Sequence, residues 1–232
     1  MSVHGIEFII SFLTLVIAYA IVVTTAGYFR AWVALQFGDD TSESLGFLSF
    51  NPLVHVDFLG GLFLLFFGFG WGRYAPINPH KICGHFRVLK IVLAYLSDSF
   101  AHLVMAIGVF IALIYSFGFS VLHLAAPMFF TGNLLQSQFA QAYPSSSSLA
   151  ISLGLIGIAL VFLSVLLAVL NFIISGFNLL ALILLEKSPS YSKYRNVLVI
   201  ALPMLMIYFF INPLRFLVVR FLYFLANLLG GI

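Results

Sequence analysis

The stretch FLSFNPLVHVDFLGGLFLLFFGFGWGRYAPINP, residues 47–79, decides how the rest of this chain is arranged. Two Asn-Pro pairs, Asn51-Pro52 and Asn78-Pro79, bracket an apolar run rich in Gly and Phe. Because Pro fixes φ and has no backbone N–H, each pair predicts a turn or a break. The run 58–72 falls short of the about 20 residues that a helix needs to cross a bilayer. We therefore expect a short or re-entrant membrane segment, which is tolerated only where protein covers it or water fills a cavity.

The overall composition points to a membrane protein. The 232-residue chain is 63% hydrophobic and 7% charged, whereas soluble domains average about 25% charged residues. The ten Lys and Arg residues are too few and too scattered for nucleic-acid binding, which needs a clustered basic face. No internal repeat or domain boundary is visible, so residues 1–232 are expected to form one polytopic domain in the lipid bilayer. The single cysteine, Cys83, excludes an internal disulfide bond.

The apolar runs predict an all-α integral membrane protein. We expect about four to six membrane helices and a small β-containing, re-entrant element around residues 41–79. The first helix should end at Gly38-Asp39-Asp40. One or two short strands fit the alternation of apolar and polar residues within 41–50. The predicted helices cover residues 6–37, 88–116, 148–185 (tilted or broken near Asn171 and Gly176), 196–212 and 214–230, the last two separated at Asn212-Pro213.

Basic residues gather in two segments, 73–90 and 186–195. Cytoplasmic loops of membrane proteins carry an excess of Lys and Arg. Since two predicted spans separate these segments, both are expected on the cytoplasmic side, with the uncharged segment 117–147 on the other side.

Two long, adjacent motifs resemble the site-2 protease family of intramembrane zinc metalloproteases, in its short bacterial form. GDDTSESLGFLSFNPLVHVDFLG (38–60) is similar to that family's G-D-x-T…G-R-L-T-L-N-P-L-x-H-I-D-P-x-G, and FGFGWGRYAPINP (67–79) to its F-G-W-A-K-P-V-P-V-N-P. NFIISGFNLL (171–180) resembles the start of the last catalytic helix. The resemblance implies a site-2 protease-like core in the bacterial inner membrane. The retained motif positions are Asn51, Pro52, His55, Asp57, Gly60, Trp71, Asn78, Pro79 and Asn178.

The resemblance also implies a zinc site, from which this chain departs. The family's H-E-x-x-H puts two imidazole ligands and a general base on one helix, and a later Asp is the third ligand. By register these positions are Ala26, Gly27 and Arg30, and Glu186 takes the place of the Asp. Ala and Gly offer neither ligand nor base, and a protonated Arg would oppose a dication. We therefore expect a degenerate site with no zinc and no other cofactor.

These departures favour a catalytically inactive protein. The favoured hypothesis is not an enzyme but an accessory or scaffold subunit that binds transmembrane helices of other membrane proteins. A Phe cluster is the candidate contact, made of Phe63, Phe66, Phe67 and Phe69. One alternative is an intramembrane metalloprotease with relocated ligands, drawn from His55, Asp57 and Glu186. Another is a small proton or solute pathway.

The candidate residues for that pathway are Asp98 and His102, which stand four residues apart in the predicted helix 88–116. Ionisable residues inside a span are costly and are often functional. The two residues are expected to form a proton relay, a satisfied Asp–His pair or a contact between helices. Arg30 is expected to pair with Asp57 or Glu186 across the former zinc site, or else to reach the membrane interface.

Two further polar groups have structural or metal-binding interpretations. His55 and Asp57 would most simply satisfy backbone groups of their own turn. The H-x-x-C-x-H pattern of His80, Cys83 and His85 has the ligand types of a metal site, although neighbouring basic residues disfavour a cation.

Overall fold

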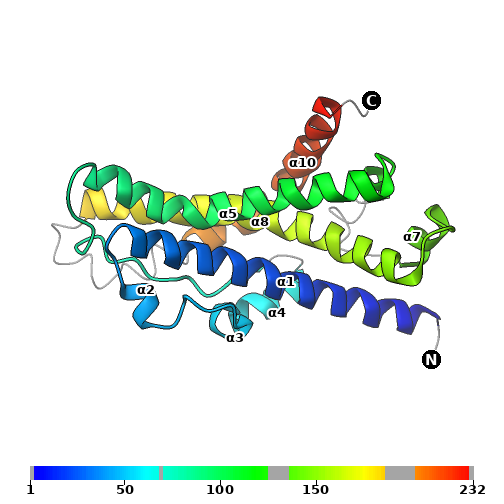
Figure 1. Ribbon diagram of the computed structural model, residues 1–232, viewed down its shortest axis with the longest axis horizontal. Helices are drawn as coiled ribbons and strands as arrows, with labels where there is room; N and C mark the ends of the chain where they lie inside the picture. The colour runs from blue at the N-terminus through cyan, green and yellow to red at the C-terminus, as the bar shows by residue number, and fades with distance from the viewer. Residues whose placement is uncertain (1–2, 68–69, 125–135, 186–201, 230–232) are drawn as a thin grey trace.

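The computed structural model describes residues 3–67, 70–124, 136–185 and 202–229. Helices α1 (Val3–Gln36), α5 (Arg87–Phe117) and α8 (Ser148–Leu185) lie lengthwise against one another (Figure 1). In sequence order each of the three runs opposite to the one before it. Helix α10 (Leu202–Leu228) crosses this bundle and packs on α8. The expectation of a mostly helical protein is therefore confirmed.

Three of the described helices are long and apolar enough to cross a membrane. At 1.5 Å per residue, the 34 residues of α1 reach about 50 Å, against about 30 Å of hydrocarbon. Helix α1 ends where predicted, because Gly38 adopts a φ of 93° that favours glycine. The candidate spans are Ile6–Gln36, Arg87–Phe117 and Ser148–Ile183, with a shorter apolar helix at Phe216–Leu228. The predicted number of four to six membrane helices is not confirmed in these residues.

Several local predictions are wrong. Residues Thr41–Ser44 form a short helix, α2, and no strand occurs within the described ranges. The only β pairing there is an isolated bridge between Val56 and Gly72. Helix α8 continues past Asn171 and Gly176 without a break. Helix α10 runs through Pro213, as membrane helices tolerate, and residues 196–201 of the predicted span lie outside the described residues.

The stretch 47–79, with which the sequence analysis began, folds back on itself. Helix α3 (Pro52–His55) is followed by α4 (Phe58–Phe67), whose ten residues are about 15 Å long. The bridge between Val56 and Gly72 places the two ends of the segment 56–72, which contains α4, side by side. A Cβ atom at Gly60 would lie only 2.0 Å from the backbone oxygen of Trp71, so glycine alone allows this approach. The returning strand-like segment 70–76 then lies against α1.

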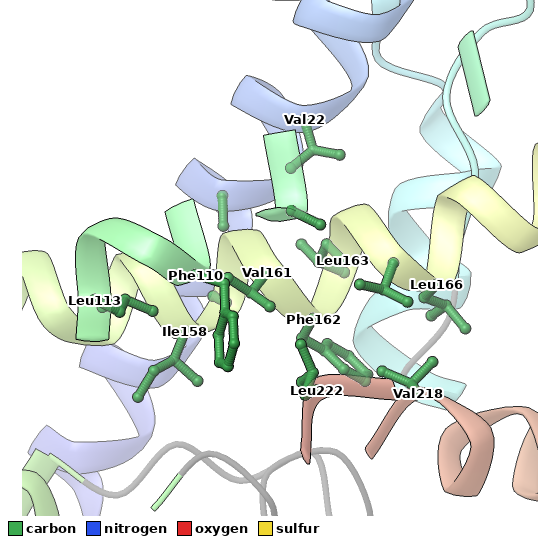
Figure 2. Close-up of a cluster of buried hydrophobic side chains, with 14 of the residues drawn as sticks. Val22, Phe110, Leu113, Ile158, Val161, Phe162, Leu163, Leu166, Val218 and Leu222 are labelled. Atoms are coloured by element: carbon green, nitrogen blue, oxygen red, sulfur yellow. The ribbon is translucent and has the colours of Figure 1, made fainter. Parts of the chain in front are cut away.

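The apolar core lies between α8 and its neighbours (Figure 2). Phe110 and Leu113 of α5 face Ile158 and Phe162 of α8, and all four side chains are buried. Helix α7 (Gln136–Ala142) covers the end of this core near Gly154. This packing holds the long helices in a fixed register around the polar site described below.

Gly154→Ala should destabilise the protein by about 1–3 kcal/mol, the usual cost of overpacking a core. The new Cβ atom would lie 2.6 Å from Cζ of Phe139 and 2.9 Å from Cζ of Phe117. Reversible unfolding in mixed micelles measures the change. Gly176→Ala, in the same helix with nothing within 4 Å, is the matched control. Equal effects of the two substitutions would contradict the packing described here.

Candidate functional site

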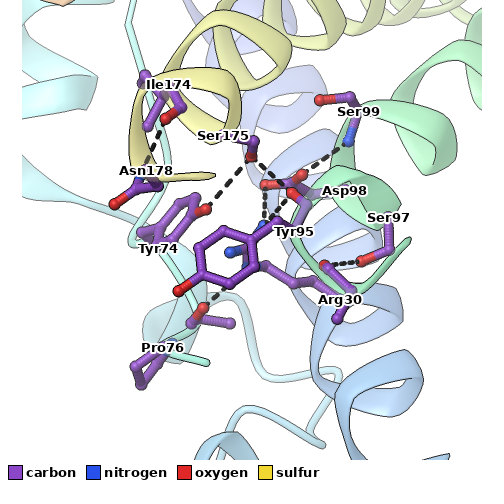
Figure 3. A network of polar contacts seen from close by, with 12 residues as sticks. Arg30, Tyr74, Pro76, Tyr95, Ser97, Asp98, Ser99, Ile174, Ser175 and Asn178 are labelled. Atoms are coloured by element: carbon purple, nitrogen blue, oxygen red, sulfur yellow. Dashed lines mark hydrogen bonds and ion pairs between the residues drawn. The ribbon is translucent and has the colours of Figure 1, made fainter. Parts of the chain in front are cut away.

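Arg30 is the centre of a buried polar network inside the helical bundle (Figure 3). Its side chain is 1% exposed and extends from α1 toward the segment 72–76 and α5. Nε donates to the carbonyl oxygen of Ala75 at 2.9 Å. Nη1 donates to the carbonyl oxygen of Tyr95 at 2.8 Å and lies 3.2 Å from Oδ2 of Asp98. One guanidinium therefore joins three parts of the chain that are distant in sequence.

Two tyrosines and a serine complete the network. The Arg30 guanidinium lies over the Tyr74 ring, 3.7 Å from its centroid. Oγ of Ser175, on α8, donates to the Tyr95 carbonyl at 2.5 Å. Since that hydroxyl has only one hydrogen, the Tyr74 hydroxyl at 3.3 Å must donate to it. Burial raises the pKa of Tyr74 to about 12, so the phenol keeps the proton that it donates.

A small cavity opens beside this network. Its volume of about 20 Å³ is enough for about one water molecule. Both apolar and polar side chains line it, from α1, the segment 72–75, α5 and α8. The lining residues are Val23, Ala26, Gly27, Arg30, Gly72, Arg73, Tyr74, Ala75, Asp98, His102 and Asn171.

The His55 imidazole fills the space beside Gly27. Its Nε2 lies 2.8 Å from the carbonyl oxygen of Ser49. Burial lowers the pKa of His55, so the ring is neutral near pH 7. Nε2 must then carry the hydrogen that it donates to Ser49, which leaves Nδ1 as an acceptor. Nδ1 is buried without a hydrogen-bond partner, and a Cβ atom at Gly27 would lie 2.3 Å from it.

Most of the retained motif residues hold turns together. Asn51 Oδ1 accepts from the N–H of Leu53 and caps α3, and Asp57 Oδ1 accepts from the N–H of Gly60. Trp71 contributes its backbone oxygen, which accepts from the hydroxyl of Tyr19 at 2.6 Å.

The second Asn-Pro turn is held in a similar way. The backbone N–H of Asn78 donates to Asp39, whose other carboxylate oxygen accepts from the N–H of Thr41. Asn178 donates to a carbonyl of its own helix, that of Ile174. The two bonds of Asp39 hold Asn78 next to the end of α1.

The structure changes the predicted pairing of Arg30. Its carboxylate partner is Asp98 and not Asp57, and Glu186 lies outside the described residues. Asp98 and His102 both line the cavity, but Asp98 bonds to Arg30 and to the N–H of Ser99. Nδ1 of His102 is buried with no hydrogen-bond partner among the described atoms. The expected Asp98–His102 pair is therefore replaced by an Arg30–Asp98 pair.

The other candidate groups lie away from this network. Among the described residues, no group of three or more His, Cys, Asp or Glu side chains is placed to hold a metal ion. This includes the H-x-x-C-x-H pattern of His80, Cys83 and His85, in which Cys83 is exposed. Phe63 and Phe66 are exposed on α4. Phe63 contacts the ring of Trp71, while Phe69 and the side chain of Phe67 lie outside the described residues.

Sequence reasoning missed Tyr74, Tyr95 and Ser175. Two signals were available. Tyr74 stands within the retained motif GWGRYAPINP. Tyr95 precedes Asp98 by three residues, which places the two on the same face of a helix.

Comparison with known proteins gives one relative. The chain is 35% identical over 97 residues to a Bacillus subtilis (strain 168) protein named "Putative zinc metalloprotease YwhC". The match spans 40% of this chain and 42% of that protein. No family model matches the chain, and no solved structure matches it. The similarity supports the resemblance to the site-2 protease family over part of the chain.

This similarity contradicts the prediction that the chain is not an enzyme. The relative is named as a metalloprotease, so the comparison points to an enzyme. The prediction rested on the side chains at four positions, and substitutions at those positions do not by themselves exclude chemistry carried out by other residues.

The zinc ion that the resemblance implies does not fit the described residues at the expected place. Ala26 and Gly27 have no ligand atom, and the space next to Gly27 is taken by the His55 ring. Arg30 puts a fixed positive charge there, already paired with Asp98. A dication beside a guanidinium would be repelled strongly in a buried site.

Asp98→Asn should destabilise the protein by about 3–5 kcal/mol, because the buried Arg30 charge loses its partner. Chemical unfolding in mixed micelles measures the loss. Asp40→Asn removes an acid of similar size from the exposed Lys81–Asp40 ion pair and should change little. A small effect of Asp98→Asn, equal to that of the control, would show that the buried pair does not hold the helices.

Gly27→Ala should destabilise the wild-type protein by about 1–3 kcal/mol, through overlap with Nδ1 of His55. In a His55→Ala background the same substitution should cost much less, because the overlapping ring is gone. The melting temperatures of the four proteins give the coupling. Gly108→Ala, with open space at the Cβ position, is the control. The same cost in both backgrounds would contradict the contact.

Proposed function

We propose that this chain is a membrane-embedded, site-2 protease-like protein that binds transmembrane segments of other proteins at the cavity beside Arg30. The observation that carries the proposal is the placement of this polar cavity within apolar helices. Ionisable residues such as Arg30 and Asp98 are expensive inside a membrane and are functional by default. A purely structural bundle would fill this position with apolar side chains, which are often at least as stable as a buried ion pair.

The sequence similarity to YwhC supports the proposed binding of polypeptides independently of the structure. A protein named as a metalloprotease acts on polypeptides, and the present chain shares part of its sequence with one. Two residues that line the cavity also have surface outside the core, because Arg73 is exposed and Asn171 is half-buried. In this proposal a polypeptide segment in the membrane contacts these two residues at the edge of the cavity, whose interior has room for about one water molecule.

In this proposal the Arg30–Asp98 pair takes the central position that zinc holds in the family. The guanidinium already has hydrogen bonds to Ala75 and Tyr95, so it is held rigidly. Binding requires no metal under this arrangement.

Hydrolysis of a peptide bond is the second candidate, and the similarity to a metalloprotease favours it. Its ligands would have to include residues beyond those described, of which Glu186 is one. Within the described residues, Asp57 accepts from Gly60 and His55 is turned to Ser49.

Photo-crosslinking tests the proposed binding. The full chain is placed in lipid nanodiscs with a synthetic probe peptide of about 24 residues, made of Leu and Ala with Lys at both ends and a central Gly-Ser pair. A benzoylphenylalanine at position 73, on the cavity rim, should crosslink the probe. The same residue at position 115, where Tyr115 is 90% exposed at the far end of α5, should not.

The outcome also separates binding from hydrolysis. Absence of a crosslink at position 73, or equal crosslinking at both positions, would contradict the proposed site. Shorter probe fragments in the mass spectrum, lost when a zinc chelator is added, would support the second candidate.

A further inference from the structure

Two basic side chains at the start of α5 are not balanced by acids. The segment 73–90 contains four Lys and Arg residues and no Asp or Glu. Lys81 forms an ion pair with Asp40. Arg87 and Lys90 have no carboxylate partner within the part of the chain that the structure describes, and they bond to backbone carbonyl oxygens instead. Two positive charges therefore remain without a counter-charge at this end of the bundle.

These two side chains are close together and have unused donors. Arg87 and Lys90 are three residues apart on one helix, so they are neighbours on its surface. Arg87 is exposed and donates to Ile82 and Pro79 through Nε and Nη2, which leaves both hydrogens of Nη1. Nζ of Lys90 donates to Cys83 at 3.3 Å and has two further hydrogens. The donors of such a pair match the charged oxygen atoms of a phosphodiester.

An exposed apolar strip begins beside these charges and continues along α5. With 3.6 residues per turn, Leu89, Leu93, Phe100 and Val104 lie within about 60° of one another around the helix, and all four are exposed. Asp98 lies on the opposite side, where α5 packs on α1. The strip is therefore an outer face of the bundle.

The length of the strip corresponds to one leaflet of a bilayer. At 1.5 Å per residue, the distance from Leu89 to Phe100 along α5 is about 16 Å, and half of the hydrocarbon thickness is about 15 Å. Phe86, next to Arg87, is 75% exposed in a left-handed backbone conformation with a φ of 60°, which is uncommon for a bulky residue. Exposed apolar side chains next to Lys and Arg are typical of a membrane interface.

We propose that the start of α5 binds one anionic phospholipid, whose phosphodiester pairs with Arg87 and Lys90 and whose acyl chain lies along Leu89, Leu93 and Phe100. Charge complementarity determines the class of lipid, because a zwitterionic headgroup would bring a second cation next to the two basic side chains. The sequence predicts that this end of α5 is cytoplasmic, and the cytoplasmic leaflet is the one that carries anionic lipid. The site is separate from the cavity beside Arg30, which lies inside the bundle.

Native mass spectrometry of the full chain in detergent tests this binding. Phosphatidylglycerol and phosphatidylcholine with identical acyl chains are titrated separately, and the dissociation constant of the first bound lipid is measured for each. The wild-type chain should bind phosphatidylglycerol about tenfold more tightly or better. Glycerol phosphate, which is the headgroup without acyl chains, should not displace the bound lipid.

Substitutions assign the preference to the two basic residues. Lys90→Gln and Arg87→Gln should each reduce the preference for phosphatidylglycerol about fivefold, the contribution of one basic residue near an anionic surface. Lys81→Gln lowers the net charge by the same amount but removes a charge that Asp40 already balances, so it should leave the preference unchanged. If Arg87→Gln does not fold, because Arg87 also holds its loop, the comparison of Lys90→Gln with Lys81→Gln decides.

A photoactivatable phosphatidylglycerol with a diazirine in the middle of its acyl chain tests the position of the chain. Its crosslinks should fall within residues 89–104 of α5. Equal affinity for the two lipids, or equal effects of Lys81→Gln and Lys90→Gln, would overturn the proposal. Displacement by glycerol phosphate would assign the site to a soluble phosphate and would also overturn it, as would crosslinks spread evenly over the exposed faces of α1 and α5.

Discussion

The buried ion pair between Arg30 and Asp98 is the interaction on which the other features of this structure depend. A charge enclosed by apolar helices must be paired and hydrogen-bonded, because its desolvation costs several kcal/mol. Arg30 lies on α1 and meets this requirement only if α1 packs against both α5 and the segment 72–76. The segment supplies the carbonyl oxygen of Ala75, and α5 supplies the carbonyl oxygen of Tyr95 and the carboxylate of Asp98. The tight turn at Gly60 and the bridge between Val56 and Gly72 bring that segment back to α1. The contacts that assemble the helical bundle are therefore the same ones that form the polar network of Arg30.

The sequence predicted the long helices well and the polar contacts poorly. Continuous apolar runs identify α1, α5 and α8 to within a few residues, because a helix in lipid must be apolar over its whole length. The break at Pro213 and the strands within 41–50 were wrong, since short-range patterns do not determine how neighbouring elements pack. The partner of Arg30 could not be read from the sequence. It depends on which faces of α1 and α5 meet, and residues 30 and 98 are far apart in the chain.

The similarity to a metalloprotease favours an enzyme, whereas the chemistry of the centre around Arg30 does not favour a zinc site. The shared sequence supports a protease-like protein, whereas the described residues at the expected zinc position are a methyl group, a glycine and a guanidinium. The His55 ring occupies the space next to Gly27, where a Cβ atom would lie 2.3 Å from its Nδ1. Binding of a polypeptide beside this centre is compatible with both observations, because binding precedes any chemistry performed on the polypeptide.

The zinc content of the protein tests the central claim, that a guanidinium stands where the family would place a metal. The full chain is purified without chelators from cells grown with added zinc, and its metal is measured by elemental analysis. The account predicts far less than one zinc atom per chain and the same melting temperature before and after treatment with a chelator. One zinc atom per chain, lost on chelation together with thermal stability, would contradict it.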